Sequence, residues 1–176
     1  RRKIAQKTSS EPLICSPDLK GRTELFRILT NKKINYEIGD CSEFDFMNSI
    51  FKKNKPDAVI HYAEQPSAPY SMKGFYEAKY TLNNNLNSTF NLIWCVLKHC
   101  PDCHIIKLGT MGEYGTPNID IEEGWIDINH KGRKDKFLFP RQSGSLYHTT
   151  KILDTDLIWF YVRTYGLKVT DLMQGP

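Results

Sequence analysis

The sequence has few cysteines and no long apolar segment. Five of its 176 residues are cysteine, and no apolar run approaches the ~18 residues that a membrane span requires. Cys100 and Cys103 form the only C-x-x-C pair, and His99 and His104 flank it. A zinc site would need a second pair or suitably spaced histidines, so a loop between a helix and a buried strand is the simpler interpretation. We therefore expect no metal, no membrane partner and a reducing compartment, either the cytoplasm or, in a photosynthetic eukaryote, the plastid stroma.

An excess of one charge is also missing. The chain has 24 Lys and Arg against 20 Asp and Glu, and the net charge of +4 is spread along the sequence. This balance does not predict a nucleic-acid partner. A length of 176 residues and a hydrophobic content of 40% fit about one globular domain, and we take residues 1–176 as one partial domain.

Helical and extended patterns alternate along the chain. The spacing of apolar residues predicts helices over 19–33, 77–99 and 143–165, and another that has Ser42 as its N-cap and includes Phe44 and Phe51. Short apolar runs predict strands at 36–38, 58–60, 104–108 and 168–172, and a hairpin over 126–138. Alternation of this kind predicts an α/β fold with a doubly wound, parallel, Rossmann-like sheet.

Polar or small residues follow several of the predicted strands. They are Asp40, Ala63, Thr110 and Gln174. Ligands of open parallel sheets bind beyond the carboxyl ends of the strands, so these residues are candidates for a binding site.

Tyr147 and Lys151 form a Tyr-x-x-x-Lys pair on the last predicted helix. Residues four apart share a helix face, so the Lys151 ammonium is expected beside the Tyr147 phenol, where it would lower the pKa of that phenol. Such a phenol can take a proton from an alcohol while hydride leaves the same carbon, and Thr110 can hold the alcohol in place. His148 is a second candidate base near neutral pH, although its side chain is expected to point elsewhere on the helix.

Three segments, in this order, resemble the extended short-chain dehydrogenase/reductase family: IGD at 38–40, VIHYAEQ at 59–65, which is similar to a His-x-Ala-Ala-type signature, and NNLNST at 84–89. Longer runs resemble one family within it, the UDP-sulfoquinovose synthases: EQPSAPYSM at 64–72, KLGTMGEYGTP at 107–117, NIDIEEG at 118–124, SLYHTTK at 145–151 and TDLMQG at 170–175. The resemblance extends from about residue 35 to the last residue.

The resemblance implies NAD as cofactor, and UDP-glucose and sulfite as substrates. It implies catalytic roles for Thr110, Tyr147 and Lys151, with His148 as a further candidate. The implied cofactor-binding residues are Asp40 at the adenine, the Cys41 backbone, Ala63 and Glu64 near the nicotinamide ribose, Asn85 as a support, and Tyr147, Lys151 and Gln174. The implied substrate-binding residues are Gln65, Thr110, Met111, Gly112, Glu113, Tyr114 and Arg141.

Two departures bear on the chemistry. Pro66 stands where the UDP-sulfoquinovose synthases usually have an arginine, which suits a sulfur oxyanion; Arg141 or His148 could supply the missing donor instead. Met111 and Gly112 stand where related 4,6-dehydratases have Asp and Glu, so neither position can transfer a proton. Glu113 lies one residue later and remains a possible acid.

The start of the chain lacks a strand followed by a Gly-rich turn that would cradle a pyrophosphate. We therefore expect an internal fragment of a longer enzyme, without the first strands and the C-terminal substrate domain, and a homodimer at full length. The expected activity is NAD-dependent conversion of UDP-glucose and sulfite to UDP-sulfoquinovose through a 4-keto-5-ene intermediate, for a sulfolipid or a glycan. The alternatives are a UDP-sugar 4-epimerase or 4,6-dehydratase that does not use sulfite, and a non-catalytic fragment or binding module.

Overall fold

The computed structural model describes residues 19–122 and 124–175 and divides the chain into two compact units, Arg1–Asp40 and Cys41–Pro176. In the first unit, helix α2 spans Leu19–Thr30 and begins where the sequence predicts. Residues 32–39 form neither helix nor strand, so the strand predicted at 36–38 is wrong. Three residues form a strand only when a neighbouring strand accepts and donates their hydrogen bonds. The expectation of a single partial domain stays a prediction.

The second unit is built on a parallel sheet. Its strands are β1 (Ala58–His61), β2 (His104–Thr110) and β5 (Lys168–Gln174), in the order β1-β2-β5. The register places Val59 beside Ile105 and Ile105 beside Val169. The predicted Rossmann-like parallel sheet is therefore confirmed.

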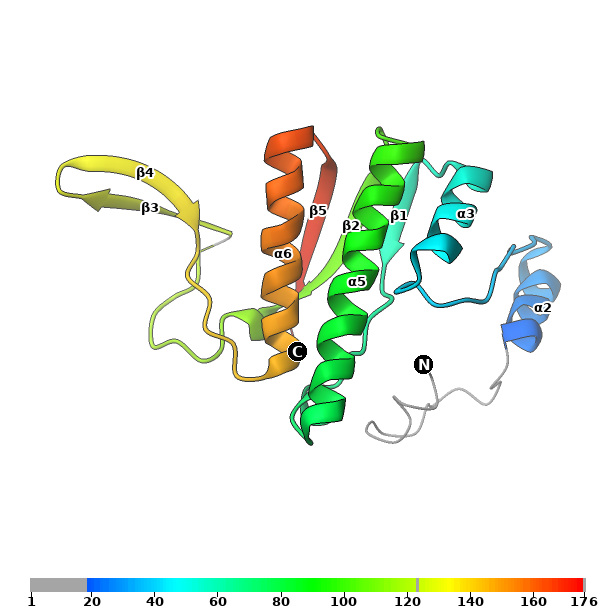
Figure 1. Ribbon diagram of the computed structural model, residues 1–176, viewed down its shortest axis with the longest axis horizontal. Coiled ribbons are helices and arrows are strands. Elements are labelled where there is room, and N and C mark those ends of the chain that lie inside the picture. The colour runs from blue at the N-terminus through cyan, green and yellow to red at the C-terminus, as the bar shows by residue number, and fades with distance from the viewer. Residues whose placement is uncertain (1–18, 123, 176) are drawn as a thin grey trace. The chain divides into compact units, whose positions relative to one another are not determined.

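Three helices of this unit pack together on the sheet: α3 (Phe44–Asn54), α5 (Phe75–His99) and α6 (Leu146–Tyr165). In Figure 1, α5 and α6 run side by side in front of the strands. Side chains alternate across a strand, so every second residue of β2 points at these helices. Ile105 does so, and it is buried in a core with Leu92, Val96, Ile158 and Tyr161.

The ends of the helices follow local rules in part. Ser145 caps α6 by accepting a hydrogen bond from the His148 amide at 3.2 Å, and Gly166 ends the helix with a left-handed φ of 72°. At α3 the predicted cap, Ser42, is wrong. The N-cap is Glu43, whose side chain makes no capping hydrogen bond.

The predicted hairpin is present, with strands β3 (Trp125–His130) and β4 (Arg133–Leu138). Its turn contains Lys131 and Gly132, whose φ angles of 50° and 77° fit a tight two-residue hairpin turn. The Trp125 ring packs edge-on against Trp159 of α6, with centroids 5.0 Å apart. Two short elements were not predicted, the helix α4 (Ala68–Ser71) and the 3-10 helix η1 (Met111–Glu113).

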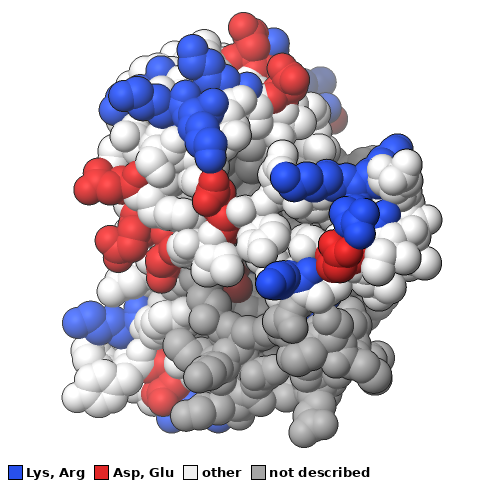
Figure 2. Space-filling view, turned by 90° about the vertical axis from the view of Figure 1, so that its right-hand side faces the viewer, with Lys and Arg blue, Asp and Glu red and all other residues white. Residues whose placement is uncertain are grey.

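The surface mixes both signs of charge. On the face shown in Figure 2, Lys and Arg side chains lie next to Asp and Glu side chains. Among the described residues, no helix combines the length and the apolar character needed to cross a bilayer.

Candidate active site

One pocket of about 360 Å³ lies where β2 and β5 end, beside the start of α6. Thr110 and Gln174 are paired in the register, and both line the pocket. Tyr147 and His148 line it from α6. The complete lining is Leu108, Gly109, Thr110, Met111, Gly112, Tyr147, His148, Gln174 and Gly175. We call this the Thr110–Tyr147 pocket.

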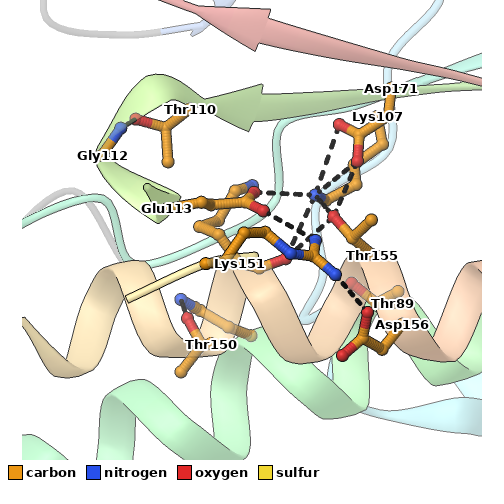
Figure 3. Close-up of polar contacts among 12 residues, drawn as sticks. Thr89, Lys107, Thr110, Gly112, Glu113, Thr150, Lys151, Thr155, Asp156 and Asp171 are labelled. Carbon is orange, nitrogen blue, oxygen red and sulfur yellow. Dashed lines mark hydrogen bonds and ion pairs between the residues drawn. The ribbon is translucent and has the colours of Figure 1, made fainter. Parts of the chain in front are cut away.

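Thr110 leaves β2 and caps η1. Its Oγ1 accepts a hydrogen bond from the Gly112 amide at 3.2 Å, a contact that Figure 3 shows. A hydroxyl that accepts in this way can still donate its own proton to a substrate oxygen.

Tyr147 is held by its backbone. The Tyr147 amide donates to Ser71 Oγ at 3.1 Å, which ties the first turn of α6 to α4. Burial, together with the negative charges of Glu64 and Glu113, raises the pKa of Tyr147 to about 12. The prediction of a lowered pKa is therefore wrong for the chain without cofactor.

Lys151 shows why the prediction failed. Its Nζ lies 2.7 Å from Glu64 Oε1, and the two side chains are only 3% and 6% exposed. The ammonium charge that was expected to act on the phenol is thus opposed by a carboxylate at hydrogen-bond distance. Glu64 was assigned to the cofactor through its backbone, whereas its side chain forms this ion pair.

His148 lines the same pocket as Tyr147, so the expectation that it points elsewhere is wrong. Its Nδ1 lies 2.9 Å from Ser145 Oγ, and its ring centroid is 5.0 Å from that of Tyr147. Gly112 makes room for the ring, because a Cβ at that position would lie 2.4 Å from His148 Nε2. Burial lowers the pKa of His148, although Glu113 opposes the effect, so the neutral form is favoured.

Glu113 and Arg141 turn into the protein and do not line the Thr110–Tyr147 pocket. The Glu113 side chain is fully buried between Lys107 and Arg141, and Figure 3 shows it pointing toward Lys107. Arg141 is 3.1 Å from Glu113 Oε2 and also pairs with Asp156. The charges of both residues therefore already have partners in the chain alone, and their assignment to the substrate stays a prediction.

Lys107 was missed in the sequence. Its Nζ is fully buried and contacts Thr155 Oγ1 at 2.6 Å and Asp171 Oδ2 at 3.0 Å. Burial alone would lower the pKa of Lys107, but the charges of Asp171 and Glu113 outweigh it and raise the pKa. The available signal was a lysine inside an apolar strand, on the same face as Ile105.

Asn85 joins three segments. Its Oδ1 accepts from the Gln65 amide at 2.8 Å, and its Nδ2 donates to Thr150 Oγ1 at 2.9 Å. Gln65 is itself buried, and its Oε1 accepts from the Ser67 amide at 2.8 Å. Asn85 therefore fixes the chain after β1 against the first turns of α6.

The other predicted residues lie at several places. The Cys41 carbonyl accepts from Asn91 at 3.0 Å, and Ala63 is half-buried after β1. Tyr114 packs edge-on against Phe139 and lines a second cavity of about 770 Å³ beside the hairpin, so it does not line the Thr110–Tyr147 pocket. Met111 lines both cavities. Asp40 is exposed at the end of the first unit, and its assignment to the adenine stays a prediction.

Asp154 was also missed. It is fully buried on α6, and its pKa is raised well above the ordinary value by burial and by the charge of Glu64. Its spacing of three residues from Lys151 was the only local signal.

Gly109, Gly112 and Gly115 have the spacing of a pyrophosphate-binding turn. Gly109 lies in β2, however, Gly112 in the three-residue η1 and Gly115 after it, so these glycines do not lead into a long helix. Gly115 has a φ of 68°, and a Cβ there would lie 2.1 Å from the Gln142 carbonyl oxygen. These glycines permit close packing of this loop, and they do not supply a helix N-terminus for a pyrophosphate.

Of the cysteine pair, Cys103 belongs to the hydrophobic core and Cys100 packs against it. Cys103 is buried, and burial raises the pKa of its thiol to about 11. Within 19–122 and 124–175, no group of three or more His, Cys, Asp or Glu side chains is arranged to hold a metal ion.

Residues 5–174 match the model of a protein family described as the NAD dependent epimerase/dehydratase family. The chain belongs to this family. A relative from Spinacia oleracea, named UDP-sulfoquinovose synthase, chloroplastic, is 45% identical over 157 residues, which cover 89% of this chain and 33% of that protein. The UDP-sulfoquinovose synthase of Sulfolobus acidocaldarius is 42% identical over 176 residues, which cover 99% of this chain and 45% of that protein. The resemblance found in the sequence is therefore confirmed.

Solved structures agree at the level of the fold. UDP-glucose 4-epimerase from Bifidobacterium longum, in complex with NAD+ and UDP, superposes with a TM-score of 0.67 at 24% identity. The match covers 90% of this chain and 42% of the epimerase. The chain thus spans less than half of the length of these relatives and of this solved structure.

Proposed function

We propose that this chain carries the redox site of a UDP-sulfoquinovose synthase, which converts UDP-glucose and sulfite to UDP-sulfoquinovose with NAD. The observation that carries this proposal is the identity of 42–45% to two relatives of that name, over 89–99% of the chain. The geometry of the Thr110–Tyr147 pocket supports it, because a hydroxyl donor and a phenol face the same space at the ends of parallel strands.

The residues present fit the nicotinamide half of NAD. Two buried polar atoms after β1, Gln65 Nε2 and Glu64 Oε2, have no hydrogen-bond partner among the described residues. Burying such atoms costs free energy unless a ligand or a water molecule forms the missing hydrogen bonds. Lys151 Nζ is adjacent and has donors beyond the one directed at Glu64. These three residues would hold the ribose and amide groups of the cofactor.

Tyr147 acts as the base in the first step. Bound NAD would supply the hydride acceptor for carbon 4 of the sugar. Thr110 donates a hydrogen bond to the 4-hydroxyl and keeps it near the Tyr147 oxygen, to which the hydroxyl proton passes. Because the pKa of Tyr147 is about 12 in the chain alone, the phenol needs additional positive charge before it can act as a base near neutral pH.

The 4-keto group then acidifies carbon 5, so water leaves from carbon 6 and a double bond forms between carbons 5 and 6. Sulfite would add at carbon 6 while carbon 5 takes up a proton. The return of the hydride to carbon 4 would then be accompanied by the return of the Tyr147 proton to the 4-oxygen. His148 is the donor that the pocket offers to a sulfur oxyanion. If Ser145 donates to Nδ1, Nε2 carries a proton toward Gly112 and the pocket. Pro66 is exposed and has no donor, and Arg141 is engaged by Glu113 and Asp156.

The 4,6-dehydratase alternative conflicts with the packing of His148. A glutamate at position 112 would place its Cβ 2.4 Å from His148 Nε2, so a second acid at that position and the observed imidazole exclude each other. The 4-epimerase alternative is favoured by Pro66, because an epimerase needs no oxyanion site.

An activity assay of the natural-length gene product distinguishes these activities. Incubated with UDP-glucose and sulfite, it is expected to yield a UDP-sugar with a carbon–sulfur bond, detected by mass. A product that is a 4-epimer or a 4-keto-6-deoxy sugar, made equally with and without sulfite, would replace the proposal with the epimerase or dehydratase. If the protein binds the UDP-sugar but converts none of it, the remaining interpretation is a non-catalytic binding module.

We also propose that α5 and α6 form a homodimer interface. Phe90 and Trp94 of α5 and Phe160 of α6 are 42%, 39% and 48% exposed. An exposed aromatic face on two adjacent helices is typical of subunit contacts. Phe160→Glu should halve the mass measured by sedimentation, whereas Lys168→Glu should not. We further propose that the protein works in a reducing compartment. The name of the spinach relative places that protein in the chloroplast.

A further inference from the structure

Glu64 stands where the His-x-Ala-Ala-type signature has its last alanine, in His61-Tyr62-Ala63-Glu64. Its carboxylate is 6% exposed and lies 2.7 Å from Lys151 Nζ. A carboxylate buried this deeply is stable only beside a cation or a set of donors. Lys151 belongs to the catalytic Tyr-x-x-x-Lys pair, so the cation that Glu64 opposes is the one expected to ionise Tyr147.

Three other titratable groups lie near the Glu64–Lys151 pair: Asp154, His61 and Lys107. Asp154 of α6 is buried, and burial together with the charge of Glu64 raises its pKa, which favours the neutral form. His61 Nε2 of β1 lies 3.7 Å from Glu64 Oε1 and 3.1 Å from Thr89 Oγ1 of α5. Lys107 of β2 is paired with Asp171 and with Glu113 of η1. Lys151 is therefore the cation with which Glu64 makes its short contact.

We propose that Glu64 is a positioning residue that balances the charge of Lys151 and keeps Tyr147 protonated until positive charge enters the pocket. The proposal deepens the proposed function and rests on the role given there to Tyr147. The pair Glu64–Lys151 then acts as a restraint, because the phenol becomes a base only when positive charge has entered the pocket. The pKa of Tyr147, raised to about 12 by burial and then by Glu64, agrees with this arrangement.

The sign of the expected change follows from the charges. Removing the Glu64 anion leaves the Lys151 ammonium unopposed, which favours the phenolate. The pKa of Tyr147 then falls, and the acidic limb of kcat/KM against pH, which rises as Tyr147 loses its proton, moves to lower pH. An opposite charge within ~4–6 Å moves a pKa by about one to three pH units, so we expect a displacement of at least about one pH unit.

The test compares Glu64→Gln, which removes the charge, with Glu64→Asp, which keeps it, in the natural-length gene product. The first readout needs no turnover. The phenolate absorbance of each variant is measured as a function of pH. The curve of the same variant with Tyr147→Phe added is then subtracted, and the difference is the titration of Tyr147. Glu64→Gln should bring the Tyr147 midpoint below about 11. Glu64→Asp should keep it near the wild-type value, as should Glu43→Gln at an exposed position.

The pH profile of kcat/KM is the second readout, and it should move with the titration. An unchanged Tyr147 midpoint in Glu64→Gln overturns the proposal, and so does the same displacement in Glu64→Asp. If Glu64→Gln does not fold, Glu64→Gln/Lys151→Met removes both charges together, and its Tyr147 midpoint should lie below that of Lys151→Met alone. Because the absorbance titration uses no sugar, a wrong substrate assignment leaves its outcome intact.

Discussion

The backbone of Gly112 lies against the imidazole of His148 so closely that a Cβ at 112 would sit 2.4 Å from Nε2. This contact joins η1 to the first turn of α6 at the Thr110–Tyr147 pocket. It also explains why residue 112 is a glycine although its backbone angles do not require one, because the His148 ring occupies the space that a side chain would need.

Gly112→Ala should therefore displace His148 and break its contact with Ser145. Overpacking of this kind costs about 1–3 kcal/mol of unfolding free energy. His148→Ala should remove most of that cost, so the two substitutions should couple in a double-mutant cycle measured by chemical denaturation. Gly144→Ala is the matched control, since a Cβ there meets nothing within 4 Å. Additive effects at 112 and 148 would contradict the packing.

Tyr147→Phe should abolish turnover of the natural-length protein and leave its fold intact, because one hydroxyl is removed and the Ser71 contact uses the backbone amide. General acid–base groups contribute about 10²–10⁴-fold to a rate. The measurement is kcat on UDP-glucose, with circular dichroism as the check on folding. A phenylalanine variant with most of the wild-type rate would remove Tyr147 from the mechanism.

Lys107→Met should destabilise the chain by about 3–5 kcal/mol, because Glu113 and Asp171 would lose the cation between them. Lys168→Met provides the comparison. Lys168 also pairs with an aspartate, Asp102, but its side chain is 59% exposed, and exposed pairs contribute at most about 1 kcal/mol. Urea denaturation of both variants measures the two losses of unfolding free energy. Equal losses would show that burial does not make the Lys107 ion pairs more important for stability than the exposed Lys168 pair.

Asp154→Asn should change how stability depends on pH. Burial and the charge of Glu64 raise the pKa of Asp154 in the folded chain above its value in the unfolded chain, which favours the protonated form. The stability that this proton contributes is complete below the unfolded pKa of about 3.9 and falls as pH rises toward the folded pKa. The variant should therefore gain unfolding free energy relative to wild type as pH rises above about 4, by up to about 1.4 kcal/mol per pH unit. Asp127→Asn, at an exposed position of the hairpin, should show no such gain.

Local patterns in the sequence predict most of the second unit. The apolar runs of β1, β2 and β5 and the helical spacing of α5 and α6 depend on neighbours within each segment. The hairpin follows from its turn residues. The strand at 36–38 failed, because strand formation depends on a partner that the local pattern does not contain.

The electrostatics of the site could not be predicted in the same way. Lys151 and Tyr147 are four residues apart on α6, so the sequence alone places them on one side of that helix. Glu64 is 87 residues from Lys151, and their contact at 2.7 Å reverses the expected effect on the phenol. Arg141 and Glu113, 28 residues apart, engage each other for the same reason. Long-range ion pairs of this kind arise only when the strand ends and α6 come together.

Asn85 has a consequence for the order of folding. Its hydrogen bonds reach across 20 residues to Gln65 and across 65 residues to Thr150. Contacts so distant along the chain close large loops, and the entropy of closure delays them until nearby elements have formed. The pocket is thus expected to be completed late, after α5 has formed and when α6 docks. Bonds absent from the folding transition state govern the rate of unfolding, so Asn85 acts on how long the assembled pocket persists more than on how fast it forms.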